Sequence, residues 1–235
     1  DAAGDGVVGP GFARMSSETG LPAATRLSVA AGVSAGAGLP LWGDLLGELA
    51  RVAGVEPDAL WSLSSFLDQA AVLEDRLNET DPDALGSIIA DQLASHVFSL
   101  LHALLASLDT PAAVTTNYDT LYEDARAAAS RPVAVLPNEL DPDKSEWLLK
   151  MHGCVTKPDS IVLSREHYNA YAESRSVLAG ILQTQLMTKR MLFVGFGLTD
   201  DNFHKIVSAV RASCVNPSAR TPGAASQAAT KASND

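Results

Sequence analysis

The sequence predicts an α/β protein in which a Rossmann-like parallel sheet carries an inserted helical subdomain. Short apolar runs without alternation recur along the chain, which is typical of strands covered on both faces of a parallel sheet. A long segment of helical spacing, about residues 41–108, separates the first of these runs from the others. Glycines and polar residues stand directly after several runs, where the carboxyl ends of parallel strands form a ligand-binding edge.

Both ends of the chain differ in composition from its middle. Residues 1–25 are rich in Gly, Ala, Ser and Pro and predict a flexible arm, and residues 213–235 are polar and predict a disordered linker or tail. Residues 26–212 form the predicted domain. Its strand candidates are Leu27–Ala31, Ala112–Thr116, Val133–Leu136, Leu148–Met151, Ile161–Leu163 and Met191–Phe196. The last run is the most apolar, and we expect it to be covered on both faces.

Prolines mark the starts of the predicted helices. Pro40, Pro57 and Pro82 each stand where a helix can begin, because proline is favoured in a first turn, and Asp81 is a candidate N-cap. Apolar residues at helical spacing follow: Leu85, Ile88, Ile89, Leu93, Val97, Leu100, Leu101, Leu104 and Leu105. This arrangement predicts a binding cleft between the helical insert and the carboxyl ends of the strands.

The composition argues against several classes of protein. The chain is 46% hydrophobic, which is enough for a substantial core, and its net charge of −11 disfavours nucleic acid or an anionic membrane as a direct partner. Cys154 and Cys214 form no C-x-x-C pair, so neither a disulfide framework nor a four-cysteine zinc site is expected. No apolar run reaches the length of about 18 residues that spans a bilayer. We therefore expect a cytoplasmic protein.

The first motif, VAAGVSAGAGLPLW, follows a predicted strand and leads into a helix. Turns of this kind bring backbone N–H groups against the phosphates of a dinucleotide, and small side chains permit that approach. The same small side chains would also let another part of the backbone pack closely. The sequence leaves both explanations open.

Three further motifs also fall at strand ends. In AVTTNYDTLYE, Asn117 and Asp119 can bind ribose hydroxyls or orient a water, or they can cap the helix that begins near Thr120. In WLLKMHGCV, His152 precedes a glycine that permits an unusual turn, and it is either a base or a packed histidine. In MLFVGFGLTDDNF, two glycines suggest close approach to a ligand, while Thr199 and the acids after it fit a helix start.

In this order the motifs resemble the sirtuin superfamily, and more closely its prokaryotic sirtuin-like branch, whose members are NAD hydrolases of antiphage defence. The resemblance covers roughly Leu27 to Val210. It implies that NAD is bound as the substrate and that the bond between nicotinamide and ribose is cleaved to release nicotinamide and ADP-ribose. It also implies a homo-oligomer or a partner protein of a defence system.

The resemblance assigns roles to individual residues. Asn117 would hold the nicotinamide ribose or the attacking water, and His152 would be the general base. The NAD-binding set would be Ala30, Ala31, Gly32, Val33, Ser34, Thr116, Asp119, Gly195, Phe196, Gly197 and Asp201.

This chain departs from the family pattern at several positions. Ala30 stands where the first motif usually has glycine, and Gly197 replaces a small hydroxyl residue. The four cysteines of the zinc ribbon of protein deacylases are missing, so we expect no zinc, and peptide deacylation is disfavoured. Two alternatives to the hydrolase remain: a non-catalytic module that senses NAD or ADP-ribose, and a deacylase or ADP-ribosyl transferase.

Overall fold

The computed structural model describes residues 24–214 except 80, 83, 142, 198 and 199. The predicted arm, apart from its last two residues, and the predicted tail beyond Cys214 lie outside the described residues, as does Thr199. Five strands form one parallel sheet in the order β3-β4-β2-β1-β5. They are β1 (Thr25–Val29), β2 (Ala112–Thr115), β3 (Ala134–Leu136), β4 (Trp147–Lys150) and β5 (Arg190–Val194). The predicted α/β class with a parallel sheet is confirmed.

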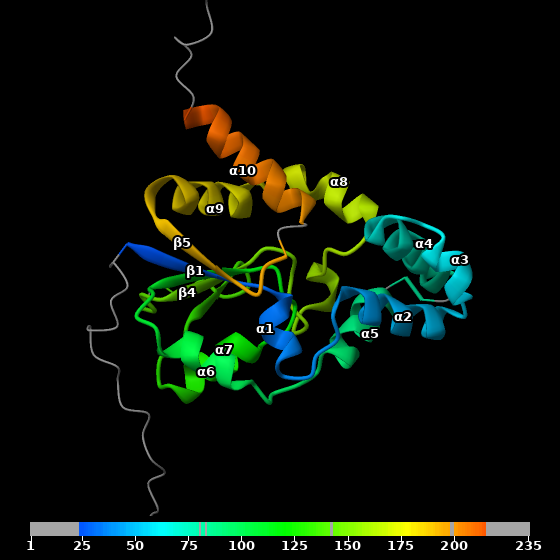
Figure 1. Cartoon of the computed structure of the whole chain (residues 1–235), viewed down its shortest axis with the longest axis horizontal. Helices are drawn as coiled ribbons and strands as arrows, with labels where there is room; N and C mark the ends of the chain where they lie inside the picture. Colours follow the sequence, from blue (N-terminus) through cyan, green and yellow to red (C-terminus); the bar gives the residue numbers. More distant parts are fainter. Residues whose placement is uncertain (1–23, 80, 83, 142, 198–199, 215–235) are drawn as a thin grey trace, which may run out of the picture.

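Helices cover both faces of the sheet (Figure 1). One face carries α6 (Leu100–Ser107) and α7 (Leu121–Ala128); the other carries α8 (Arg165–Ser174), α9 (Ser176–Thr188) and α10 (Asp201–Cys214). Successive residues of β4 point to opposite faces of the sheet, and because both faces are covered, both residues are apolar. Leu148 packs toward the α6–α7 face and Leu149 toward the other, and both are fully buried.

A group of four helices lies beyond the carboxyl ends of the strands (Figure 1). It consists of α2 (Trp42–Ala53), α3 (Pro57–Trp61), α4 (Phe66–Asn78) and α5 (Ala84–Gln92). Its apolar core includes Tyr118 from the loop after β2. Because this group meets the sheet where the strands end, the loops that carry the predicted site residues lie between the two.

The long apolar stripe after Pro82 forms two helices that pack in different places. Leu85 and Ile89 of α5 belong to the core of the helical group, whereas Leu105 of α6 packs against the sheet. Ser99 separates them as the N-cap of α6, with its side chain accepting from the backbone of His102. Equal spacing of apolar residues therefore does not reveal that the chain turns between the two helices.

The prediction of a strand at Ile161–Leu163 is wrong. This segment is an extended loop after a short 3-10 helix (Pro158–Ser160), and the Val162 N–H donates to His152 O at 2.9 Å. Ile161 and Leu163 pack into the helical group, and Val162 packs toward α8–α10. The run is apolar because it is buried between two cores, and burial alone does not require pairing with a strand.

The expectation that the run Met191–Phe196 is covered on both faces is also wrong. β5 pairs only with β1 in the described part of the chain and lies at the edge of the sheet. Leu192 and Phe193 expose 36% and 37% of their surface. Hydrophobicity predicted the strand correctly, but the position of a strand in a sheet depends on tertiary contacts that a local run does not encode.

Candidate active site

The turn between β1 and α1 (Ala31–Ala35) packs against the end of β5. The Ala30 N–H donates to Val194 O and the Gly32 N–H donates to Gly195 O, both at 3.1 Å. A Cβ on Gly32 would lie 2.9 Å from Gly195 O, so the absence of a side chain at this position is required by packing. Ala30 has a φ of −135°, a conformation open to any residue, which explains why a methyl group is tolerated there.

Replacing Gly32 by Val is therefore expected to lower the free energy of unfolding by about 1–3 kcal/mol, as for an overpacked site. The matched variant is Ala31→Val, because Ala31 is exposed in the same turn. It should leave stability nearly unchanged but raise KM for NAD if the phosphates lie against this turn. Chemical denaturation and steady-state kinetics on both variants test this. A fully stable Gly32→Val protein would contradict the packing account.

The side chain of Asn117 is held by a chain of hydrogen bonds to α1. Its Nδ2 donates to Ser34 Oγ at 2.8 Å, and the Ser34 hydroxyl donates to Asp119 Oδ2 at 2.8 Å. The other carboxylate oxygen of Asp119 accepts from the Leu121 N–H at 3.0 Å. Ser34 and Asp119 are both buried, so in this structure they fix Asn117 and the start of α7. Asp119 therefore contacts both Ser34 and the first residue of α7, although the N-cap of that helix is Thr120.

His152 follows β4 and is only 3% exposed. Its Nε2 lies 3.4 Å from Asp200 Oδ2, and its ring packs at 5.4 Å from the ring of Tyr168 and at 5.9 Å from that of Tyr171. The Tyr168 hydroxyl donates to the same Asp200 oxygen at 2.9 Å. Burial raises the pKa of Tyr168, which keeps this hydroxyl protonated as the donor. The Asp200 carboxylate thus contacts both the Tyr168 hydroxyl of α8 and the His152 imidazole.

The pKa of His152 lies below its ordinary value of 6.5. Burial is the main cause, because desolvation disfavours the imidazolium, and Arg175 lowers the pKa further. Asp200 acts in the opposite direction but does not reverse the shift. At neutral pH the imidazole is therefore uncharged and able to accept a proton.

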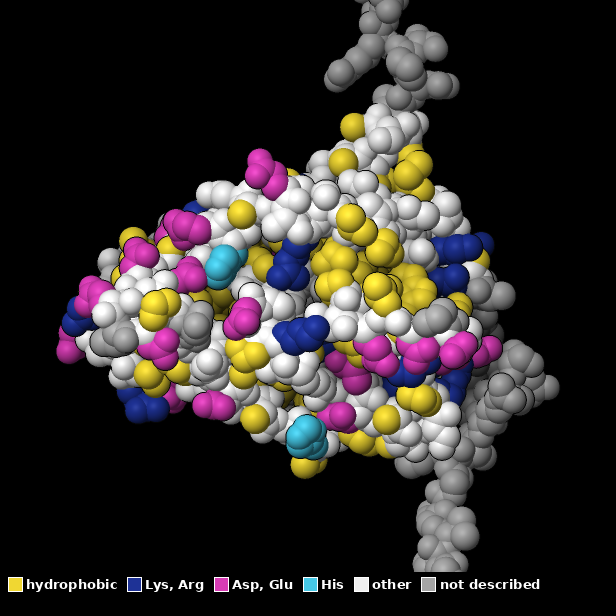
Figure 2. Space-filling view, turned by 180° about the vertical axis from the view of Figure 1, so that it is seen from behind, with side chains coloured by type: hydrophobic (Ala, Val, Ile, Leu, Met, Phe, Trp, Pro, Cys, Tyr) yellow, Lys and Arg dark blue, Asp and Glu magenta, His cyan; other side chains and the backbone are white. Residues whose placement is uncertain are grey.

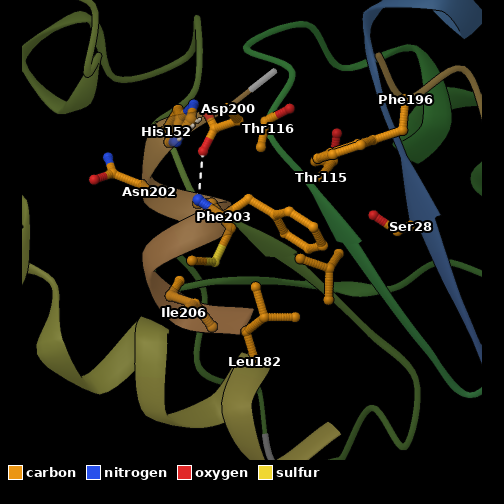
Figure 3. A pocket seen from close by; sticks show the side chains of 12 residues that line it. Ser28, Thr115, Thr116, His152, Leu182, Phe196, Asp200, Asn202, Phe203 and Ile206 are labelled. Atoms are coloured by element: carbon orange, nitrogen blue, oxygen red, sulfur yellow. Dashed lines mark hydrogen bonds and ion pairs between the residues drawn. The ribbon is translucent and has the colours of Figure 1, made fainter. Parts of the chain in front are cut away.

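A pocket adjoins His152 between the strand ends and α10 (Figure 3). The figure shows His152 beside Asp200, with the Phe196 ring extending toward Thr115. The volume that the centre of a water molecule can occupy in this pocket is about 10 Å³, so the pocket holds about one water. Asn202 also lines it and is 2% exposed, and its Nδ2 has no hydrogen-bond partner among the described residues. A larger hollow of about 780 Å³ lies between the α1–α2 loop and Trp61, away from the histidine.

The structure gathers the predicted residues into three clusters. Thr116, His152 and Phe196 line the pocket, Ser34, Asn117 and Asp119 form the hydrogen-bonded chain, and Ala30, Gly32 and Gly195 meet at the packed turn. Of the others, Ala31 and Gly197 are exposed at the strand ends, and Val33 is a core residue with no exposed surface.

The acidic residue that contacts His152 is Asp200, and not its neighbour Asp201, which the sequence had suggested for the site. Asp201 is exposed at the first residue of α10, whereas the carboxylate of Asp200 accepts from the Phe203 N–H at 2.6 Å and faces His152. Sequence reasoning also missed Tyr168 and Tyr171. Their spacing of three on a helix placed both on one face, which is the signal that could have indicated their common contact with His152.

Charged side chains are distributed over the surface of the protein. Figure 2 shows acidic side chains spread over the face seen there, with Lys and Arg interspersed among them. Within the described ranges, no cluster of three or more His, Cys, Asp or Glu side chains is placed to hold a metal ion. None of the described helices is long and apolar enough to cross a membrane.

A parallel sheet with helices on both faces, and with loops that carry polar side chains at its carboxyl edge, defines the Rossmann-like class of α/β folds. The SIR2-like domain family matches residues 111–229, just over half of the chain, and the chain belongs to this family.

Several named relatives extend the likeness toward the N-terminus. The NAD(+) hydrolases ThsA of Enterococcus faecium and of Bacillus cereus are 30% and 31% identical to this chain. Each match covers 77% of this chain and 38% of the relative, so the chain spans about two fifths of their length. A defense-associated sirtuin 2 of Bacillus subtilis is 27% identical over 47% of this chain and 12% of its own length.

Proposed function

We propose that this chain is the catalytic part of an NAD hydrolase that cleaves the bond between nicotinamide and ribose, and that it acts in antiphage defence by depleting NAD in the cytoplasm. The observation that carries the proposal is the placement of Asn117 and His152 after the neighbouring strands β2 and β4, with the imidazole kept neutral. The names of the relatives support the same reaction, since four of them are NAD(+) hydrolases.

The chemistry requires little from the protein besides binding and orientation. Nicotinamide leaves as a neutral molecule and takes the electron pair of the broken C–N bond. A water oxygen forms the new bond to the ribose carbon, and its proton passes to the neutral His152 and then to solvent. Asn117 orients the water or the ribose hydroxyls through its side-chain amide.

The pocket must widen before NAD can reach His152, because its present volume admits about one water. Movement of Phe196 or of the segment that carries Asp200 would open it. We therefore propose that assembly, either into a homo-oligomer or with a defence partner, favours the open form. If the chain is strictly monomeric and fully active at low concentration, its activity is not regulated by assembly.

The direct test is incubation of the purified protein with NAD and separation of the products by chromatography. Release of nicotinamide with an equal amount of ADP-ribose is expected, and a cyclic or transferred product would show that another acceptor replaces water. Tight binding of NAD without any release, at every protein concentration and with the assembled form, would favour the sensing module instead.

The pH dependence of turnover should reflect the lowered pKa of His152. Because the neutral imidazole is the base, kcat/KM is expected to decline as pH falls, with the midpoint of the decline below pH 6.5. Protonation of the buried ring also opposes folding, so the free energy of unfolding should fall as pH drops below 6.5.

Asp200→Asn removes the charge that raises the pKa of His152 and should move the decline in kcat/KM to still lower pH. A decline centred above 6.5 would exclude His152 as this base.

A further inference from the structure

A lysine with no exposed surface lies at the end of β4. The ammonium of Lys150 contacts three acceptors: Tyr118 O at 3.2 Å, Asp119 O, and the Glu123 carboxylate at 2.8 Å. The ammonium donates hydrogen bonds to the two carbonyl oxygens and forms an ion pair with the carboxylate. A buried charge is costly unless it is paired and hydrogen-bonded in this way.

Glu123 keeps the lysine charged. Burial is the largest single influence and by itself would lower the pKa of Lys150. Glu123, Cys154 and Asp119 together raise it by more, with Glu123 first among them, so the net pKa lies above the ordinary value. Lys150 is therefore a cation at neutral pH and attracts the carbonyl oxygens of the turn.

The two carbonyl groups belong to the residues that directly follow Asn117. The same lysine stands two residues before His152, so it ties the strand of the histidine to the turn of the asparagine. Other contacts hold the side chains of this turn: Ser34 binds the Asn117 amide, and the Tyr118 hydroxyl donates to Val162 O at 2.8 Å. The Val155 N–H also donates to Tyr118 O, at 2.9 Å. Lys150 differs from these contacts in that one group binds two successive carbonyls of the turn.

We propose that Lys150 is a positioning residue of the active site: by binding the Tyr118 and Asp119 carbonyls it sets the distance and orientation of Asn117 relative to His152. The inference rests on the proposed function for its catalytic consequence. Its structural part, the anchoring of the turn, stands independently. A displacement of a reacting group by about 1 Å can cost about 100-fold in rate, which is the scale of effect expected here.

The test compares Lys150→Met with Arg126→Met. Arg126 is a matched control because it is also a cation without exposed surface, lies on α7, and pairs with Glu146 away from the turn after β2. Both variants should unfold at lower denaturant concentration than wild type. Lys150→Met leaves the largely buried Glu123 without its cation, and Arg126→Met removes hydrogen bonds to Arg131 O and Ala106 O, while Glu146 keeps its ion pair with Arg131. At a temperature where both are folded, Lys150→Met should lose about 100-fold in kcat with a much smaller change in KM. Arg126→Met should retain its kcat within about 3-fold.

Amide hydrogen exchange supplies a readout that does not depend on turnover. Exchange at the amides of Asn117 and Val155, which donate to Thr115 Oγ1 and to Tyr118 O, should be at least about 10-fold faster in Lys150→Met than in wild type and unchanged in Arg126→Met. If Lys150→Met does not fold, the double variant Lys150→Met with Glu123→Gln removes the unpaired charge, and the same losses in kcat and protection are expected from it.

The outcomes separate the two proposals. Wild-type exchange and wild-type kcat in a folded Lys150 variant would overturn the positioning role. Equal losses of kcat in the Lys150 and Arg126 variants would also overturn it, because they would indicate a general effect of stability. If the wild-type protein releases no nicotinamide, the proposed function fails, while the exchange measurements still decide whether Lys150 anchors the turn.

Discussion

His152→Ala and Asn117→Ala are each expected to lower the rate of nicotinamide release by about 10²–10⁴-fold, the usual contribution of a positioned base or orienting group. Asn117→Ala removes one hydrogen bond, to Ser34, and should leave the melting temperature close to that of wild type. His152→Ala also removes ring contacts with Tyr168 and Tyr171 and should lower stability as well as turnover. Turnover and thermal unfolding must therefore be measured on the same preparations.

A second buried histidine provides the control for this loss of packing. His102 is fully buried near the start of α6, does not line the pocket, and takes part in the cap of that helix. His102→Ala should lose stability to a similar degree and retain turnover where it is folded. Near-wild-type turnover in both His152→Ala and Asn117→Ala would show that the catalytic assignment is wrong.

Gly153→Ala is expected to be the most destabilising single substitution near the site. Gly153 has a φ of +96°, which costs a residue with a side chain about 1–3 kcal/mol. Its Cβ would lie 2.1 Å from Ser160 O, so the loop that carries Ile161 must move, at a further cost of about 1–3 kcal/mol. A decrease of about 2–6 kcal/mol in the free energy of unfolding is expected from denaturant titration.

Gly38→Ala separates the two causes of this loss. Gly38 has a similar φ of +87°, but no neighbouring atom lies within 4 Å of the position that its Cβ would take. It should lose only the smaller part that comes from the backbone conformation, about 1–3 kcal/mol. Equal losses in the two variants would show that contact with the Ser160 carbonyl costs nothing. In the fraction of Gly153→Ala that folds, turnover should also fall, because the Val162 N–H binds the carbonyl of the adjacent His152.

Local sequence patterns were sufficient to predict the strands that carry the site. The five strands of the sheet were all predicted as apolar runs, with boundaries that differ by a few residues, because a strand buried on both faces needs apolar side chains at successive positions. The same patterns predicted that Asn117 and His152 follow strands β2 and β4. The carboxyl ends of parallel strands meet at one edge, so this much of the site follows from the order of elements.

Contacts between distant parts of the chain could not be predicted in this way. The small residues of the first turn suggested a ligand, yet a Cβ on Gly32 would meet the backbone of Gly195, which lies more than 160 residues away in the sequence. The apolar run Ile161–Leu163 suggested a strand but fills the space between two cores. In both cases the sequence shows that a position must be small or apolar, and only the folded chain shows which neighbour imposes the requirement.

The charged residues that contact the site, Asp200 and Lys150, also could not be predicted from local patterns. The α/β class, the strand ends and the candidate pair Asn117 and His152 could be derived from residue type and local order. The contact of Asp200, and not Asp201, with the imidazole depends on the folded chain, as does the contact of Lys150 with the turn after β2. An acid or a lysine is usually exposed, and its burial becomes favourable only when partners from other elements supply the opposite charge and the hydrogen bonds.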